Sequence, residues 1–235
     1  MSFNVITLPN TPSTPMRTLP FRNRAFSLLE LLAVIFIIGI VAVFVTPAAS
    51  TILKGSQLTQ SEQIVTDQFK LARQQAVTKN RSMQVRLIRY GDPEMPGEKK
   101  TDKSTGNYRA IQVFEILESG AAVPLDKPQL LPQAIIMSPG TLSTLLSNTN
   151  MLPPKDANAT IDPPLPRGVN FEYQYVSFRF LPDGSTDLSS TSGTVWHLTL
   201  HNINDKPAGT APPPNFFTLQ VDPVSGTVRI YRPSV

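Results

Sequence analysis

Two histidines and three aspartates are the residues whose types could support metal or catalytic chemistry. His197 and His201 are the only histidines of the chain. They stand four residues apart in a stretch that alternates apolar and polar residues, so they share one face of a predicted strand about 13 Å apart, too far to share a metal ion. Asp183, Asp187 and Asp222 could gather around Ca²⁺. Two of them stand in Pro-Asp-Gly-Ser and Asp-Pro-Val-Ser-Gly, which are turn sequences that need no ion, and Ca²⁺ binding stays the alternative.

No motif of a known enzyme class accompanies these residues. The chain has no Gly-x-Ser-x-Gly, no phosphate-binding glycine-rich loop and no His-Glu-x-x-His, and it has no cysteine. We therefore predict no catalytic residue, no metal ligand set and no cofactor.

The most unusual chemical group is the carboxylate of Glu30, the one strongly polar side chain of residues 26–45. Twenty helical residues reach about 30 Å, the thickness of a bilayer's hydrocarbon core, so this run is long enough to span a membrane. A carboxylate in a spanning helix costs up to about 3 kcal/mol and should therefore have a partner or a task. If the chain is cut between Ala25 and Phe26, the new α-amino group lies one helical turn from Glu30, or within reach of Glu30 in a neighbouring copy. The amine and the carboxylate could then neutralise each other.

A basic flank before an apolar run is also typical of a signal anchor or a secretory signal peptide. The run is longer than the roughly 7–15 apolar residues of a signal peptide, and no clear Ala-x-Ala site follows it. These two features favour a helix that is retained after cleavage at its start.

The run also resembles a known family. In order, the residues that carry the resemblance are Arg22, Arg24, Ala25, Phe26, Ser27, Leu28, Leu29, Glu30 and Leu31. They are similar to the prepilin-type N-terminal segment of type IV pilins and type II secretion pseudopilins. The resemblance implies that a membrane aspartic peptidase cuts after Ala25, that the amine of Phe26 is methylated, and that Glu30 guides insertion into a helical filament. That family usually has glycine where this chain has Ala25.

Two further residues stand where many pilins carry a glycine and a proline that loosen the helix. They are Gly39 and Pro47. Because proline removes one helical hydrogen bond, Pro47 is expected to bend or locally melt the helix.

The positive charge of the chain reports on topology. Lysine and arginine total 21 against 17 acids, a net charge of +4. Removing Arg17, Arg22 and Arg24 with residues 1–25 leaves 18 basic residues against 17 acidic ones, a net charge of +1. Basic residues before a spanning helix stay in the cytoplasm, which predicts a single pass with the C-terminal domain on the other side of the membrane. The resemblance implies that this membrane is the inner membrane and that the domain lies in the periplasm. A nearly neutral mature chain argues against nonspecific binding of nucleic acid.

Four segments follow from the pattern. We expect a leader over residues 1–25, a transmembrane or filament-core helix over 26–47, an amphipathic helix over 48–82 and a globular β-rich domain over 83–235. Either Met1 or Met16 could be the start. The amphipathic helix is predicted to end near Asn80, and it carries one apolar stripe: Leu58, Val65, Phe69, Ala72 and Ala76.

The last segment has the alternation and turn residues of an antiparallel sheet. The expected strands cover residues 83–90, 108–117, 130–137, 171–181, 195–201, 216–221 and 227–231. Residues 91–106 and 138–167 are expected to be loops, the first solvated and the second with at most one helical turn. The fold class is therefore α+β: a lollipop in which a long N-terminal helix, half membrane-embedded and half amphipathic, packs on a β-sheet domain.

Other stretches resemble minor subunits of the same family. Residues 71–85, 178–185 and 221–228 look like GspH and FimT minor pseudopilins, and most of the chain looks like the Verru_Chthon cassette protein D group. The implied partners are a prepilin peptidase, an inner-membrane assembly platform, other pilin or pseudopilin subunits and membrane lipid. A pilus, a secretion pseudopilus and an uptake machine all remain open.

The leading hypothesis is thus a non-enzymatic minor pilin or pseudopilin that enters a filament. A second hypothesis is a subunit of this kind whose loops 91–106 and 138–167 bind a substrate, DNA or a surface. The third is a signal-anchored envelope protein with a β-rich ligand-binding domain.

Overall fold

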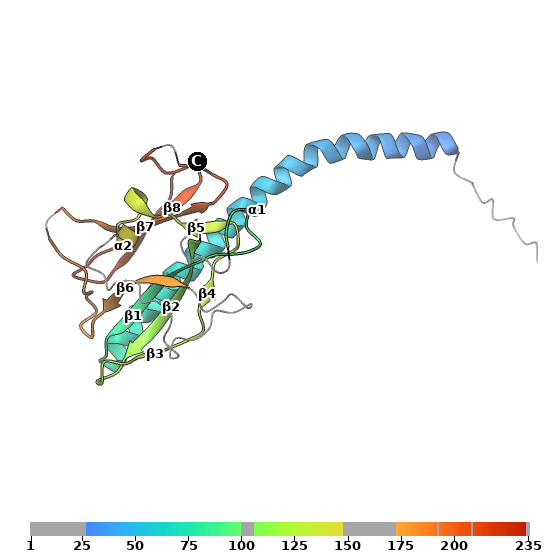
Figure 1. Cartoon of the computed structure of the whole chain (residues 1–235). Helices are drawn as coiled ribbons and strands as arrows, with labels where there is room; N and C mark the ends of the chain where they lie inside the picture. Colours follow the sequence, from blue (N-terminus) through green and yellow to red (C-terminus); the bar gives the residue numbers. More distant parts are fainter. Residues whose placement is uncertain (1–26, 100–105, 148–172, 192, 208, 234–235) are drawn as a thin grey trace, which may run out of the picture. The chain divides into compact units, whose positions relative to one another are not determined.

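The computed structural model describes residues 27–99, 106–147, 173–191, 193–207 and 209–233 (Figure 1). The chain forms two compact units, Met1–Pro47 and Ala48–Val235, and each is described by itself.

A single helix, α1 (Leu28–Lys79, 52 residues), runs through both units. It continues without a break through Pro47, so the local melting considered there is not found, and a bend at Pro47 stays a prediction. The helix ends where the sequence predicts: Asn80 takes a left-handed φ of 51°, and Arg81 N–H donates to the carbonyl of Ala76 (3.2 Å). This is the Schellman pattern that closes many helices.

The second unit contains one antiparallel sheet. Among the described residues it has nine strands in the order β6-β1-β2-β5-β7-β8-β9, with β3 and β4 pairing to β2. The strands are β1 (Met83–Tyr90), β2 (Asn107–Ile116), β3 (Ala122–Pro124), β4 (Gln129–Leu130), β5 (Ile135–Met137), β6 (Gln174–Phe180), β7 (Trp196–Asn202), β8 (Phe216–Val221) and β9 (Val228–Tyr231). The predicted α+β class, with a long N-terminal helix followed by an antiparallel sheet, is confirmed.

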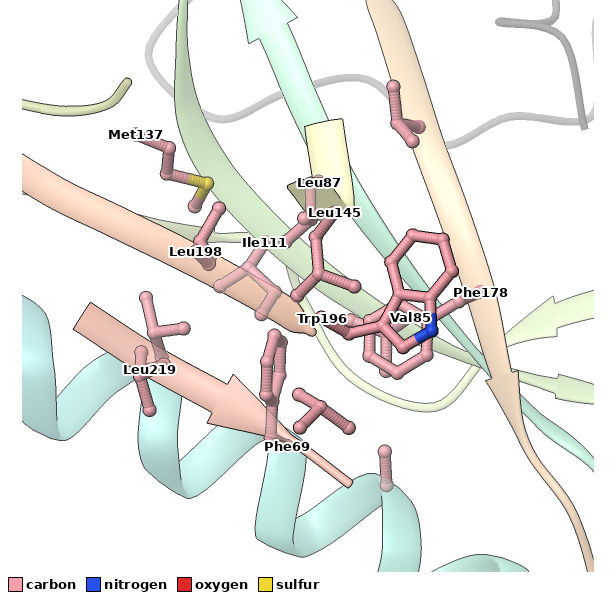
Figure 2. Close-up of a cluster of buried hydrophobic side chains, with 14 of the residues drawn as sticks. Phe69, Val85, Leu87, Ile111, Met137, Leu145, Phe178, Trp196, Leu198 and Leu219 are labelled. Carbon is pink, nitrogen blue, oxygen red and sulfur yellow. The ribbon is translucent and has the colours of Figure 1, made fainter. Parts of the chain in front are cut away.

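The apolar stripe of α1 packs on this sheet as predicted. All five stripe residues are at most 3% exposed. Figure 2 shows Phe69 directed into the cluster that also contains Val85, Trp196 and Leu219. Its ring meets the edge of Phe178 at a centroid distance of 5.4 Å. The helix therefore supplies one wall of the core, and Trp196 belongs to that core rather than to a ligand surface.

One predicted strand is wrong. The run 130–137 forms two short strands, β4 and β5, because the carbonyl of Pro132 accepts from Ile135 N–H (2.8 Å) and makes a turn between them. Proline has no N–H for a ladder, which favours a turn there. Strand β3 was not predicted.

A short helical segment lies beside the part of β7 that β5 does not pair with. It consists of η1 (Gly140–Leu142) and α2 (Thr144–Ser147), two short helical segments where the sequence predicts at most one helical turn. Strand β5 pairs only with residues 200–202 of β7. Beyond it, the hydroxyl of Ser143 accepts from Thr199 N–H (2.9 Å), and the hydroxyl of Thr144 accepts from His197 N–H (2.8 Å). These hydroxyls satisfy backbone donors that a neighbouring strand would otherwise take.

Two turns from opposite ends of the strand order meet on α1. We call them the turn pair: residues 181–186, after β6, and residues 222–227, between β8 and β9. Thr186 N–H donates to the carbonyl of Pro223 (2.9 Å). Arg73 Nε of α1 donates to the carbonyls of Gly184 (3.2 Å) and Ser225 (3.0 Å). One arginine of the helix thus joins β6 to the β8–β9 hairpin.

Candidate functional site

The described part of α1 begins with a capping box formed by Ser27 and Glu30. The backbone N–H of Ser27 donates to Glu30 Oε2 (3.0 Å), and the backbone N–H of Glu30 donates to the Ser27 hydroxyl (3.1 Å). The first N–H groups of a helix have no partner inside the helix, so the exchange supplies acceptors where they are lacking. We did not predict from the sequence that Ser27 caps the helix. The signal was present, because Ser-x-x-Glu before an apolar run is typical of a capping box.

Glu30 was expected to have a partner, and its partner in this structure is the N-cap of its own helix. The carboxylate also lies at the positive end of the helix dipole, where a negative charge stabilises a helix by about 0.3–1 kcal/mol. Five other predicted site residues lie outside the described residues: Ala25 and Phe26 of the cleavage site, and Arg17, Arg22 and Arg24 of the leader.

The first unit exposes its apolar side chains on all sides. Among residues 28–42, whose side chains the structure describes, the exposed fraction of the large apolar residues runs from 47% for Val34 to 81% for Leu28. Exposing apolar surface to water is unfavourable, and every face of this helix is apolar. Such a helix is therefore stable where lipid or other helices cover it. A search of the described residues finds no helix with both the length and the hydropathy to cross a membrane.

Gly39 and Pro47 both lie inside α1. A Cβ added to Gly39 would meet no atom within 4 Å. Packing within this chain therefore does not require glycine at this position, although glycine costs a helix about 1 kcal/mol relative to alanine. The assembly roles expected for the two residues remain predictions.

Both histidines lie on β7, as predicted, and their ring nitrogens contact different groups. His197 Nδ1 lies 3.1 Å from the Thr144 hydroxyl, while His201 is 3% exposed with Nδ1 2.7 Å from the carbonyl of Asn202. Within the described part of the chain, no group of three or more metal-ligating side chains could hold an ion.

The aspartates act within turns, which supports the predicted turn explanation for two of them. Asp183 Oδ1 accepts from the hydroxyl and the N–H of Ser185, and these bonds lower the pKa of Asp183. Asp222 Oδ1 accepts from the N–H groups of Ser225 and Val224, which lower the pKa of Asp222. Desolvation raises the pKa of Asp187, although it accepts from the N–H of Arg179 (2.7 Å).

Part of the loop predicted to be solvated is a buried ionic cluster. Arg109 is 1% exposed and has no partner in the β1–β2 register, so it is the extra residue of a β-bulge. Its Nη2 lies 2.6 Å from Glu98 Oε1 and its Nη1 lies 3.5 Å from Asp92 Oδ2. Glu98 Oε2 also accepts from Asp92 N–H (2.9 Å). Two acids of this loop, Asp92 and Glu98, thus neutralise a buried arginine, whereas Glu94 and Lys99 are exposed as predicted. The pairing with Arg109 leaves no local sequence signal.

One comparison with known protein families bears on the N-terminal segment. Residues 20–46 match the family model described as the prokaryotic N-terminal methylation motif. The match contains Ala25, Phe26, Glu30 and Gly39, and it confirms the resemblance stated from the sequence. No curated protein matches the chain.

Solved structures of two minor subunits are similar to the chain. One is the minor pseudopilin EpsH from the type 2 secretion system of Vibrio cholerae, with 10% identity and a TM-score of 0.40 over 76% of this chain and 99% of that chain. The other is the type IV minor pilin FimU of Pseudomonas aeruginosa PAO1, with 13% identity and a TM-score of 0.36 over 75% of this chain and 97% of that chain.

Proposed function

We propose that this chain is a minor pilin or pseudopilin subunit of a type IV pilus-like or type II secretion filament. The observation that carries the proposal is the match of residues 20–46 to the prokaryotic N-terminal methylation motif. Residues 28–46 of the motif lie on α1, and Glu30 is the one charged side chain of residues 28–45. The chain continues into the second unit, which contains the antiparallel sheet.

The N-terminal residues are proposed to be processed in a fixed order. Arg17, Arg22 and Arg24 hold the leader in the cytoplasm, and a prepilin peptidase cuts after Ala25. The amine of Phe26 is then methylated. Residues 26–47 remain in the inner membrane, with the second unit in the periplasm.

Assembly moves the apolar half of α1 from lipid to the helices of other subunits. Lipid tails are as apolar as leucine, so burial alone does not favour this transfer, and helix packing and polar contacts must do so. We propose that the Glu30 carboxylate supplies the polar contact by pairing with the α-amino group of a neighbouring subunit at the assembly platform.

The test is the intact mass and N-terminal sequence of the protein taken from its native membrane. We expect a start at N-methylated Phe26. An uncut N-terminus, or a cut beyond the apolar run, would reject the proposal and leave a signal-anchored or secreted β-rich domain.

A further inference from the structure

The sheet of the second unit ends in two edge strands, β6 and β9. The edge of β6 is closed by residues of its own chain. Arg179 N–H donates to Asp187 Oδ1 (2.7 Å), and Asp187 N–H donates to the carbonyl of Arg179 (3.1 Å). β9 is the last strand in the order, and within the described residues no strand pairs with its outer side. An open edge strand is a template on which another strand can pair.

The ladder between β8 and β9 determines which backbone groups of β9 point outward. Asp222 N–H donates to the carbonyl of Thr227 (3.0 Å), so these two residues form a hydrogen-bonded pair. Bonded and non-bonded pairs alternate along an antiparallel ladder. In the register of the two strands, this alternation places Val228 and Ile230 in non-bonded pairs. The N–H and C=O groups of Val228 and Ile230 therefore point away from β8, where a further strand would bond.

The side chains of β9 give the two faces of this edge different chemistry. On the core side, Leu219 is fully buried, but Ile230, its partner in the register, is 40% exposed. The apolar row of the core thus reaches the edge without being covered. On the other face, Arg229 is exposed beside Tyr231, which is 49% exposed. Residues 223–235 contain no acidic residue, so the charge that this edge offers to a partner is positive.

We propose that β9 binds an extended segment of another protein chain by strand addition. The segment would carry an apolar, an acidic and an apolar residue in succession. The backbone groups of its two apolar residues bond to Val228 and Ile230, and their side chains cover Ile230. Its acidic residue then lies opposite Arg229 on the other face, where opposite charges attract.

A second copy of this chain fits the edge less well. The register that would bond Val228 of each copy to Ile230 of the other places the two copies of Arg229 opposite each other. Like charges directly opposite destabilise a pair of strands. The inference goes beyond the proposed function and does not depend on it, because the second unit alone forms the edge.

The test titrates a fluorescent Thr-Val-Glu-Val-Thr peptide, blocked at both ends, with the full chain in detergent. Fluorescence polarisation should show binding about fivefold tighter than that of Thr-Val-Lys-Val-Thr. Methylating the two valine amides should abolish binding, because these N–H groups face β9. Arg229→Glu should reverse the preference between the two peptides. Lys127→Glu is the matched control, because Lys127 is an exposed lysine between β3 and β4.

A backbone variant tests the edge itself. Ile230→Pro removes an outward N–H but none of the bonds to β8, so it should keep the fold and abolish binding. If this variant unfolds, the reversal by Arg229→Glu decides. No binding by the folded wild type at about 1 mM peptide would overturn the proposal, as would binding that survives amide methylation. A dimer of the chain that Ile230→Pro dissociates would also overturn it, because the edge would then belong to a second copy.

Discussion

Gly226 lies at the contact between the two turns of the turn pair, where a Cβ would clash and the backbone has a positive φ. Its φ is +63°, and an added Cβ would lie 2.1 Å from the carbonyl oxygen of Gly184. Gly209 has nearly the same φ, +64°, but an added Cβ there would meet nothing within 4 Å. The pair of glycines therefore separates the cost of backbone strain from the cost of a clash.

We predict that Gly226→Ala lowers the free energy of unfolding by about 3 kcal/mol or more, against about 1 kcal/mol for Gly209→Ala. The extra loss arises because the two turns must move apart. Thermal unfolding can be followed by the fluorescence of Trp196, the only tryptophan and a buried one. Equal losses for the two variants would mean that the contact between the turns contributes nothing.

The buried ionic cluster allows a second test at single residues. Glu98→Gln leaves the buried Arg109 guanidinium with the more distant carboxylate of Asp92, at 3.5 Å, so it should destabilise the fold by about 3 kcal/mol. Arg109→Met combined with Glu98→Gln should cost less than the sum of the two single changes, because both members of the 2.6 Å pair are then removed together. A double-mutant cycle from urea unfolding measures this coupling. Additive losses would contradict a direct interaction between the two side chains.

At the residue scale, sequence reasoning succeeded where the signal is local. Asp183 and Asp222 form the predicted turns, since their carboxylates bond to N–H groups two or three residues ahead. The link from Arg73 to Gly184 joins residues 111 positions apart, and the pairing of Arg109 with Glu98 depends on a bulge. No periodicity or motif in the sequence accompanies either contact, so neither could be predicted from the sequence.

Among the elements, the segment η1–α2 supports β7 through the hydroxyls of Ser143 and Thr144. Ser143 is fully buried and Thr199 is 3% exposed. The Ser143 hydroxyl accepts a hydrogen bond from the backbone N–H of Thr199. No strand of the described residues pairs with β7 at this point on that side. The stability of the first half of β7 therefore depends on a serine that propensity alone would place in a loop.

We predict that Ser143→Ala costs about 1–3 kcal/mol, because it leaves a buried backbone donor without an acceptor. Native-state hydrogen exchange should show the largest loss of protection at the amide of Thr199. Ser190→Ala serves as the control, since Ser190 is exposed. Unchanged protection at Thr199 would mean that the donor has another acceptor.

The second half of α1 and most strands were predictable because each has a periodic pattern of apolar residues, and the first half of α1 was predictable because it is one long apolar run. Strand β1 has the predicted bounds, residues 83–90, and the buried stripe of α1 is the predicted one. The exception, residues 130–137, is apolar at both ends but contains Pro132, and the turn at this proline divides the run into β4 and β5. Strand β3 has three residues and is too short for a periodicity.

Considered as a whole, the second unit should respond to acid in two opposite ways. Hydrogen bonds lower the pKa of Asp183 and Asp222, and a hydrogen bond from Lys79 is the largest of the causes that lower the pKa of Glu115. These groups contribute stability above their ordinary pKa of about 4, and the contribution is lost as the pH falls through their lowered values. Desolvation raises the pKa of Asp187, so its protonation favours the folded state at a higher pH.

We therefore expect Tm to rise slightly as the pH falls toward about 4 and then to decrease below it. Asp187→Asn should remove the rise, and Asp222→Asn should flatten the decrease. Thermal unfolding between about pH 3 and pH 7 measures both effects. A Tm profile that neither variant alters would show that these carboxylates do not govern the acid response.

The chain divides into two compact units, and Glu30 belongs to the unit without the sheet. A change at Glu30 should therefore separate assembly from folding. Glu30→Leu removes the cost of placing a carboxylate among apolar groups, so insertion into a membrane should be at least as good as in the wild type. It also removes the carboxylate of the capping box and the proposed partner of a neighbouring amine. We predict that the variant is exported with an unchanged Tm but that its incorporation into filaments falls at least tenfold.

Filament fractions sheared from cells, together with the mass of the membrane-bound protein, provide the measurement. Glu30→Asp is the matched control for charge, because it keeps the carboxylate but shortens the side chain. Partial recovery with aspartate would assign the loss to charge and reach rather than to apolarity. If Glu30→Leu were incorporated as well as the wild type, the carboxylate would have no role in assembly, and a plain membrane anchor would explain the first unit better.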